Sequence, residues 1–252
     1  MKSINKNKII VYTAIFGSRD VLNDPIFIPE GCDFICFTDQ PFSSKIWTIQ
    51  RTAPFYKDNP NKSAKLYKIF PHRFLWGYDT SIWIDGNILV RGNVKDLEKK
   101  YLSENKFAAY NHALSHDKRS SIYEEAEAIL EAMNRGRYIH LDSSIIRKQM
   151  DTYRSDGYKG DGGLITAMIM FRRHKEPDVI NTMNAWWKEI EKYTVRDQLS
   201  FNYVAWKTNL SFSYIEGDSR DNKYFTQVPH AMSTRKKIIR KIRNLLQKIS
   251  SQ

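Results

Sequence analysis

An aspartate and an asparagine stand two residues apart where a short apolar run ends. Asp85 and Asn87 enclose Gly86, directly after the run Thr80–Ile84 (TSIWI). A divalent cation that bridges two phosphate groups needs hard oxygen ligands, which Asp and Asn side chains supply. The glycine lets the backbone approach a ligand closely. Such a triplet also fits an ordinary turn, but its place at the tip of an apolar run favours a site for a metal and a diphosphate.

Asp197 and Gln198 form a second polar pair, at the start of a predicted helix. A carboxylate in this position either caps the helix and interacts with its dipole or takes part in catalysis, and the sequence leaves both interpretations open. Arg196 is the neighbour that could keep the Asp197 carboxylate ionised.

His230 is the third candidate, just before a run of basic residues. A neutral imidazole nitrogen is a metal ligand, so His230 could complete a cation site with Asp85 and Asn87. A histidine on the surface or in the core is the alternative. The basic residues 235–237 could neutralise a departing diphosphate.

A polar loop between a predicted strand and a predicted helix could line a pocket. It contains His112, His116, Asp117 and Arg119. We take His116 and Arg119 as the candidates for contacts with an acceptor, and a solvated loop is the alternative interpretation.

These residues need a scaffold, and the composition allows one. Of the 252 residues, 41% are hydrophobic and 13% are aromatic, which suffices for a sizeable core and argues against disorder. Cys32 and Cys36 indicate neither a disulfide framework nor a zinc site, a pattern that suits a reducing cytoplasm. The first residues are polar, so no signal peptide is expected, and no apolar stretch is long enough to span a bilayer.

Apolar runs alternate with amphipathic segments along the chain. We predict strands at residues 8–16, 33–38, 47–51, 80–84, 88–90, 107–110, 164–171 and 211–215, and helices at 62–75, 121–135, 177–192 and from 196 onward. Pro71 puts the far half of the first helix in question. The alternation predicts an α/β fold with a mostly parallel central sheet flanked by helices, whose ligand lies at the carboxyl ends of the strands. Polar residues at 13–17, 39 and 85–87 follow three of the strands and predict one nucleotide-binding cleft.

Residues 235–252 differ from the rest of the chain in charge. They hold seven basic residues and no acid, so the formal net charge of +12 falls to +5 when they are left out. Their apolar residues recur at helical spacing opposite the bases, which predicts a basic amphipathic helix. Such a helix can lie on an anionic membrane surface, pack on the domain or in a homo-oligomer, or bind nucleic acid. Because no aromatic rings are interleaved with the bases, we favour the membrane or the oligomer and expect no nucleic acid partner.

Several segments resemble one protein family. They are IVYTAIFGSRD (10–20), CDFICFTD (32–39), YDTSIWIDGNILVRG (78–92), SIYEEAEAI (121–129), GLITAMIMFRRH (163–174) and RDQLSFNYVAWK (196–207). Together they resemble the glycosyltransferase-like family first catalogued as domain of unknown function 616, over residues 8–232. A more distant similarity is to the retaining GT-A transferases of glycosyltransferase family 8.

In that second family a strand ends in D-x-D, a later segment reads D-Q-x-x-L-N, and a histidine near the C-terminus completes the metal site. Asp85 and Asn87 match the first motif, with asparagine in place of the second aspartate. Asp197 and Gln198 match the start of the second motif, and His230 is the candidate for the histidine.

The resemblance implies a GT-A-like single domain over residues 1–234, a nucleotide-sugar donor that is commonly a uridine diphosphate sugar, and Mn²⁺ or Mg²⁺ as cofactor. It places Thr13, Ala14 and Phe16 at the nucleotide, Asp39 at the base, Lys65 and Asp85 near the ribose and diphosphate, Thr166 and Gln198 at the transferred sugar, and Asp85, Asn87 and His230 at the metal. The acceptor it implies is a surface polysaccharide or a lipid-linked glycan. We expect a cytoplasmic protein whose basic helix contacts the inner face of the cell membrane.

The expected reaction passes through a transition state with oxocarbenium character. If configuration is retained, Gln198 stabilises one face of the sugar and the diphosphate assists deprotonation of the acceptor. If it is inverted, Asp197 is the general base. The family analogy favours retention. The alternatives are a noncatalytic protein that binds a nucleotide sugar or a carbohydrate, and a nucleic-acid-binding module that uses the basic helix.

Overall fold

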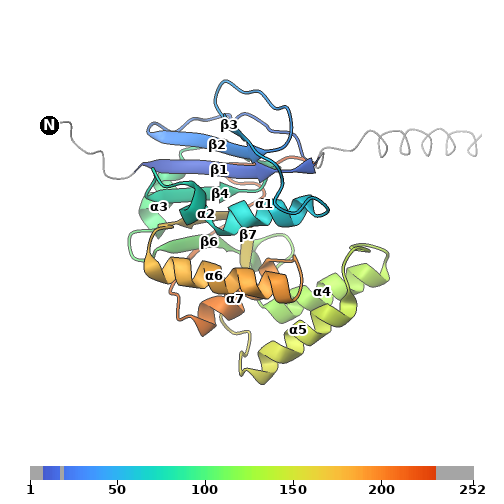
Figure 1. Cartoon of the computed structure of the whole chain (residues 1–252). Helices are drawn as coiled ribbons and strands as arrows, with labels where there is room; N and C mark the ends of the chain where they lie inside the picture. The colour runs from blue at the N-terminus through green and yellow to red at the C-terminus, as the bar shows by residue number, and fades with distance from the viewer. Residues whose placement is uncertain (1–7, 18–19, 231–252) are drawn as a thin grey trace, which may run out of the picture.

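A seven-stranded sheet runs through the protein (Figure 1). The computed structural model describes residues 8–17 and 20–230. The strands of the sheet, in chain order, are β1 (Ile9–Ile15), β2 (Cys32–Thr38), β3 (Thr48–Arg51), β4 (Thr80–Ile84), β6 (Phe107–Asn111), β7 (Ile165–Arg172) and β8 (Ser213–Ile215). In space they lie in the order β3-β2-β1-β4-β7-β6-β8.

Most neighbouring strands in this sheet are parallel. β1 pairs in parallel with β2 and β4, β2 with β3, and β6 with β8. Only β7 runs against its neighbours, with antiparallel pairing to β4 and to β6. The predicted α/β class with a mostly parallel central sheet flanked by helices is confirmed. The reversal of β7 escaped prediction because a strand buried on both faces reads as an apolar run in either direction.

A second, two-stranded sheet lies beside the end of β4. It pairs β5 (Ile88–Val90) with β9 (Phe225–Gln227) in antiparallel register. Directly after β9, the backbone N–H of Val228 donates to the carbonyl of Asn87 at 2.8 Å. This small sheet therefore brings residues 228–230 next to residues 85–87 at the end of β4.

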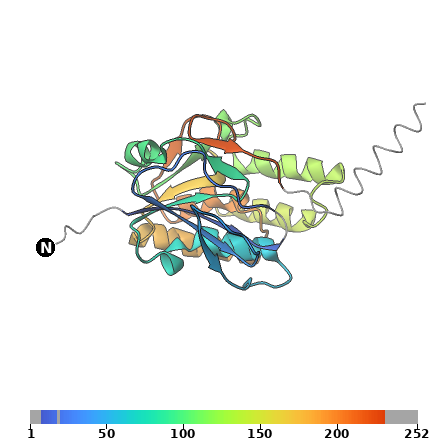
Figure 2. The ribbon, with the colours of Figure 1, turned by 90° about the horizontal axis from the view of Figure 1, so that it is seen from above.

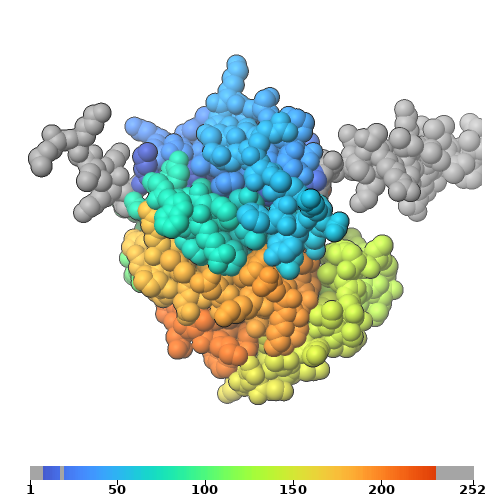
Figure 3. Space-filling model, viewed as in Figure 1, coloured from blue at the N-terminus to red at the C-terminus, as the bar shows by residue number. Residues whose placement is uncertain are grey.

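Helices cover the main sheet. They are α1 (Pro60–Ile69), α2 (Pro71–Phe74), α3 (Val94–Tyr101), α4 (Ile122–Asn134), α5 (Ser143–Ser155), α6 (Pro177–Lys192) and α7 (Gln198–Lys207), with a 3₁₀ turn at His112–Leu114. Figure 2 shows α1, α2 and α6 on one side of the sheet and α3 with the small sheet on the other. In Figure 3 the cyan and orange residues around α1 and α6 occupy the middle of the visible face, below the blue N-terminal strands, and α4 and α5 lie at its lower right.

The alternation of side chains along each strand divides the core in two. In β1, Ile10 and Tyr12 pack among residues of the α1, α6 and α7 side, whereas Ile9 and Val11 pack with residues of α3 and the small sheet. Both faces of the central strands are thus buried, which explains why Thr80–Ile84 carries no charge and is buried at every position.

Several predicted boundaries need correction. The helix predicted over residues 62–75 is two helices, because Phe70 leaves helical geometry and Pro71 begins α2. The helix predicted over 121–135 is confirmed as α4, and Ser121 caps it by accepting the N–H of Glu124 at 3.1 Å. The predicted strand at 211–215 is only three residues long, and β9 follows it. Three elements, α3, α5 and β9, were not predicted from the sequence.

Within residues 8–17 and 20–230, no helix combines the length and the apolar character that crossing a bilayer requires. The predicted basic helix at 235–252 lies outside the described residues. Cys32 and Cys36 are buried free thiols, and burial raises the pKa of Cys32 to about 11 and that of Cys36 to about 12.

Candidate functional site

One elongated cleft of about 550 Å³ opens where β1 and β4 end. Ten of the predicted site residues line it: Ala14, Phe16, Lys65, Asp85, Asn87, Arg119, Thr166, Asp197, Gln198 and His230. They come from β1 and the residue after it, α1, the end of β4, the loop before α4, β7, the start of α7 and the segment after β9. A cleft therefore lies at the predicted edge of the sheet, and its binding of a nucleotide stays a prediction.

Three predicted residues do not line the cleft. Thr13 is 1% exposed, inside β1. Asp39 lies behind the turn after β1, where its Oδ1 accepts the N–H of Gly17 at 3.1 Å. His116 donates its backbone N–H to Asp218 at 3.0 Å, and its side chain lies outside the lining. Asp39 therefore holds the turn at Gly17 through its hydrogen bond to the Gly17 N–H. The φ of Gly17 is +64°, in the left-handed region that glycine tolerates.

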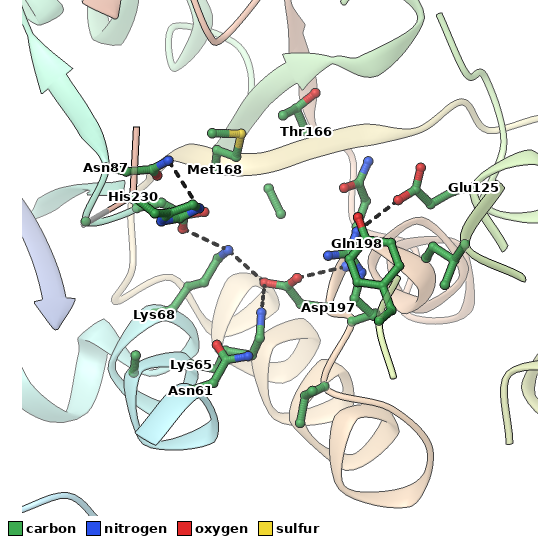
Figure 4. Close-up of a pocket in the computed structure, with 18 of the residues that line it drawn as sticks. Asn61, Lys65, Lys68, Asn87, Glu125, Thr166, Met168, Asp197, Gln198 and His230 are labelled. Atoms are coloured by element: carbon green, nitrogen blue, oxygen red, sulfur yellow. Dashed lines mark hydrogen bonds and ion pairs between the residues drawn. The ribbon is translucent and has the colours of Figure 1, made fainter. Parts of the chain in front are cut away.

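The strand pairing positions Asp85 at one end of the cleft. Its backbone N–H donates to the carbonyl of Met168 in β7 at 2.9 Å, and its Oδ1 accepts the indole N–H of Trp83 at 2.8 Å. Asn87 is 3% exposed, and its Nδ2 lies 3.4 Å from Nε2 of His230. Figure 4 shows Asn87 and His230 together at this end of the cleft.

Asp20 orients His230, although Asp20 was not among the predicted site residues. Its Oδ1 lies 2.6 Å from Nδ1 of His230. A carboxylate that accepts the proton of Nδ1 leaves the lone pair on Nε2, as in the second shell of metal-binding histidines. Because Nε2 faces Asn87, the histidine presents the nitrogen that a cation would use.

This end of the cleft fits a divalent cation through a mixed set of ligands. Asp85 and Asn87 supply oxygen atoms, which suit Mn²⁺ or Mg²⁺, and His230 supplies a nitrogen, which Mn²⁺ accepts more readily than Mg²⁺ does. Among the residues that the structure describes, no group of three His, Cys, Asp or Glu side chains is placed to hold a metal ion. A cation here would therefore depend on the amide oxygen of Asn87.

Two lysines of α1 hold Asp197. Lys65 and Lys68, three residues apart on one helix face, place Nζ 2.8 Å and 2.7 Å from Oδ2 of Asp197. Lys68 also reaches Oδ1 of Asp85 at 3.3 Å and so bridges the two carboxylates. The side chain of Lys68 is 4% exposed, so this bridge is shielded from water (Figure 4).

The predicted role of Arg196 is wrong. Its guanidinium lies 3.1 Å from Oε1 of Glu125, and the cations in contact with Asp197 are Lys65 and Lys68. The sequence neighbour does not pair with Asp197 because Arg196 extends toward α4 on the other side of the cleft.

The two lysines oppose the effect of burial on Asp197. Burial would raise the pKa of a carboxyl group, yet Lys65 and Lys68 hold the pKa of Asp197 far below its usual range. Burial likewise works to lower the pKa of Lys68, but Asp197 and Asp85 together raise it. Burial lowers the pKa of Lys65 to about 8 although Asp197 works to raise it. At neutral pH Asp197 is therefore an anion in contact with two ammonium groups.

Unpartnered polar atoms mark the middle of the cleft. Oγ1 of Thr166, Nε2 of Gln198 and Nε of Arg196 are buried and have no hydrogen-bond partner among the described residues. Buried polar groups in folded proteins nearly always have partners. These three atoms are therefore available to the hydroxyl groups of a bound ligand, and sugars are rich in such groups.

Arginines surround the end of the cleft next to α4. Glu125, which is 3% exposed, accepts from Arg119 at 2.5 Å and from Arg196 at 3.1 Å. Asp117 accepts from Arg220 at 2.6 Å and lies 3.5 Å from Arg119. Of the four residues of the predicted polar loop, His112, Asp117 and Arg119 line the cleft, and the last two share ion pairs with residues distant in the sequence.

Three solved glycosyltransferases align with most of the chain at low identity. The bifunctional glycosyltransferase WbbM in its apo form has a TM-score of 0.47 at 12% identity, over 84% of this chain and 40% of that one. Mouse xyloside xylosyltransferase 1 in its apo form has a TM-score of 0.44 at 10% identity, over 83% of this chain and 84% of that one. GlyE of Streptococcus pneumoniae TIGR4 has a TM-score of 0.41 at 13% identity, over 84% and 46%.

A curated relative is similar to the chain in sequence. It is the probable hexosyltransferase MUCI70 of Arabidopsis thaliana, which is 27% identical over 245 residues. The match takes in 85% of this chain and only 40% of the relative's length. Residues 38–230, which include all of the cleft except its β1 wall and Asp20, match the family described as TOD1/MUCI70, glycosyltransferase-like domain. The chain therefore belongs to the TOD1/MUCI70 glycosyltransferase-like domain family.

Proposed function

We propose that the protein is a metal-dependent glycosyltransferase that moves a sugar from a nucleotide diphosphate donor, a uridine diphosphate sugar, to a surface polysaccharide or lipid-linked glycan. One observation carries the proposal. Asp85, Asn87 and His230 meet at one end of a cleft whose middle holds the ionised Asp197 and the unpartnered Gln198. A diphosphate site and a site for the transferred sugar would thus adjoin.

Asp85, Asn87 and His230 are the residues that would hold Mn²⁺ or Mg²⁺, with Asp20 orienting the imidazole. The cation, when bound, would offset the negative charge that develops on the departing diphosphate. Lys68 adds a buried positive charge next to Asp85. Ala14 and Phe16 line the same end, where the nucleotide would lie.

The environment of Asp197 supports retention of configuration. A general base works best with a pKa near the operating pH, whereas two ammonium groups lower the pKa of Asp197 well below its usual range. Asp197 is therefore suited to electrostatic stabilisation of positive charge on the sugar ring and poorly suited to removing a proton. Gln198 and Thr166 would position the sugar through their unpartnered polar atoms.

A panel of nucleotide sugars, each with Mn²⁺, Mg²⁺ or chelator, tests this function through thermal stabilisation and hydrolysis. We expect one donor to stabilise the protein and to be hydrolysed only with a cation present. Asp85→Ala should abolish turnover and leave the protein folded, whereas Asp151→Ala, at an exposed position in α5, should retain it.

The outcomes of this panel separate the alternatives. Normal turnover by Asp85→Ala would exclude the metal role of that residue. Stabilisation without hydrolysis for every donor would favour the noncatalytic nucleotide-sugar-binding protein. The ion pair from Lys68 to Asp85 bears on this alternative, because it engages an oxygen of the proposed metal ligand.

The amphipathic pattern of residues 235–252 supports a peripheral position at the inner face of the cell membrane, or assembly into a homo-oligomer. A cytoplasmic location and an acceptor attached to lipid would agree with such a position.

A further inference from the structure

We infer that the end of the cleft next to α4 receives an anionic acceptor, a glycan that carries a carboxylate or a phosphate group. The inference rests on the proposed function in taking the opposite end as the donor site. It narrows the acceptor to a chemical class, and it comes from the distribution of charge in the cleft.

The charges of the cleft are segregated. From the end near β1 and β4 to the middle at Asp197, the lining holds three carboxylates and two ammonium groups: Asp20, Asp85, Asp197, Lys65 and Lys68. Near α4 it holds five guanidinium groups and two carboxylates: Arg119, Arg135, Arg137, Arg196, Arg220, Asp117 and Glu125. Residues 1–7, 18–19 and 231–252 contain no aspartate or glutamate, so side chains of those segments cannot balance the excess of arginine.

The two carboxylates near α4 are already shared. Glu125 accepts from Arg119 and Arg196, and Asp117 pairs with Arg220 and Arg119. Each guanidinium carries five N–H donors, so three arginines offer far more donors than two carboxylates can accept. Nε of Arg196 is accordingly buried without a partner among the described residues. The cluster of Arg119, Arg196 and Arg220 therefore keeps N–H donors for a further anion.

Two further arginines lie at the mouth of this end. Arg135 reaches Glu131 only at 3.7 Å with both side chains more than two-thirds exposed, a pairing that contributes little. Arg137 makes no ion pair with any described residue. The backbone holds it in place, since its N–H donates to the carbonyl of Ala132 at 2.8 Å as α4 ends.

The position of the cluster assigns it to the acceptor. In Figure 4, Glu125 and Gln198 lie on one side of Asp197, and Asn87 and His230 lie on the other. The charge of a donor diphosphate would be met on the latter side. A nucleophile that attacks the sugar beside Asp197 must approach from elsewhere, and the arginine end is the remaining part of the cleft.

The chemistry of the cluster selects the ligand class. A planar guanidinium binds a carboxylate or a phosphate through two parallel N–H bonds. Tyr138, 37% exposed, adds an aromatic surface, with the Arg196 guanidinium 5.2 Å from its ring centroid. An aromatic ring beside several arginines fits a sugar that bears an oxyanion better than it fits a neutral sugar.

Three tetrasaccharides of equal length provide the test: one with uronate groups, one phosphorylated and one neutral. Binding to the full chain is measured by calorimetry in the presence of uridine diphosphate and Mn²⁺. We expect at least one charged tetrasaccharide to bind about tenfold more tightly than the neutral one, a difference of about 1.4 kcal/mol. The stronger of the two charged ligands identifies which oxyanion the site takes. Equal binding of all three would overturn the inference.

A matched pair of variants locates the binding. Arg135→Gln with Arg137→Gln should weaken charged ligands about tenfold and leave the neutral one unchanged. Arg147→Gln, an exposed arginine of α5 outside the cleft, should change neither. The same small effect in both variants would show that the charge preference comes from the general surface and would refute the site.

Donor hydrolysis separates this inference from the proposed function. If the arginine variants impair metal-dependent hydrolysis of the nucleotide sugar, the arginine end serves the donor and the acceptor assignment is wrong. If no nucleotide binds or is hydrolysed while charged tetrasaccharides still depend on Arg135 and Arg137, the proposed function fails and the anion site stands.

Discussion

Replacing Lys68 by methionine tests the ion bridge that joins the two ends of the proposed reaction site. Nζ of Lys68 lies 2.7 Å from Asp197 and 3.3 Å from Asp85, and the side chain is 4% exposed. Methionine has a similar length and can fill the same space beside Trp83, so the substitution removes charge more than volume. Both carboxylates would then lose a buried partner.

The contacts that Asp197 and Asp85 keep in Lys68→Met set the size of the stability loss. Removing one partner of a buried ion pair costs about 3–5 kcal/mol. Lys65 still contacts Asp197 at 2.8 Å, and the side chain of Asp85 is 35% exposed and can be hydrated. We therefore expect a loss at the lower end, about 3 kcal/mol, which a domain with a stability of about 5–15 kcal/mol survives.

Urea denaturation of folded variants measures this loss, with Lys62→Met as the control on the same helix. Lys62 lies 4.0 Å from Glu191, and its side chain is 21% exposed, so its ion pair should contribute less than about 1 kcal/mol. Adding Asp197→Asn to Lys68→Met should deepen the loss, since Lys65, 2.8 Å from Asp197, would then be a buried cation without its carboxylate partner. Equal, small losses in Lys68→Met and Lys62→Met would refute the bridge.

Three further outcomes are expected. Glu125→Gln should lower the free energy of unfolding by about 3 kcal/mol, because two arginines lose a buried partner, and urea denaturation should show a much smaller change for the exposed Glu131→Gln on the same helix. Burial, with a contribution from nearby Arg172, lowers the pKa of His174 to about 4. The unfolded chain therefore takes up a proton below pH about 6.5 while the folded protein does not. Stability should fall by roughly 3 kcal/mol as the pH drops from about 6.5 to about 4, and His174→Asn should flatten that dependence in denaturation curves. Deleting residues 235–252 should reduce sedimentation with anionic liposomes, and undiminished sedimentation would count against the membrane contact.

The sequence located one end of the cleft, the end proposed for the donor, and the reason is physical. A central strand is buried on both faces, so TSIWI carries no charge and finishes on three apolar residues, which makes its end easy to find. In sheets of this kind the ligand lies at the carboxyl ends of the strands, so the polar residues after that run, Asp85 and Asn87, were natural candidates. Both line the cleft.

Two of the missed helices did carry a signal. In α5, Ile146, Met150 and Tyr153 recur at helical spacing and are buried, and Asp142 caps the first turn. In α3 the pattern is shorter, with Val94 and Leu97 buried. By contrast, β9 has three residues and forms a strand by pairing with β5. No local sequence pattern predicts such a long-range contact.

The partners of charged residues could not be predicted from sequence proximity. Arg196 precedes Asp197 in the chain but pairs with Glu125, 71 residues away, and Lys68 reaches Asp197 across more than a hundred residues. Consecutive residues at a helix start point in different directions, so adjacency is weak support for an ion pair. Two lysines three apart on one face of a predicted helix were the only local sign of the bridge.

The two interpretations of Asp197 that the sequence left open are compatible, because each uses a different oxygen. Oδ1 accepts the backbone N–H of Gln198 at 3.1 Å at the start of α7, and Oδ2 takes Lys65 and Lys68. Asp197→Asn keeps an oxygen for the cap and removes the charge, whereas Asp197→Ala removes both. The two variants should therefore share a loss of turnover, and the alanine variant should be less stable by a further amount of about 1 kcal/mol, the usual contribution of a cap. A catalytic loss in Asp197→Ala alone would mean that the carboxylate acts only by shaping the helix start, and its charge would then have no part in the reaction.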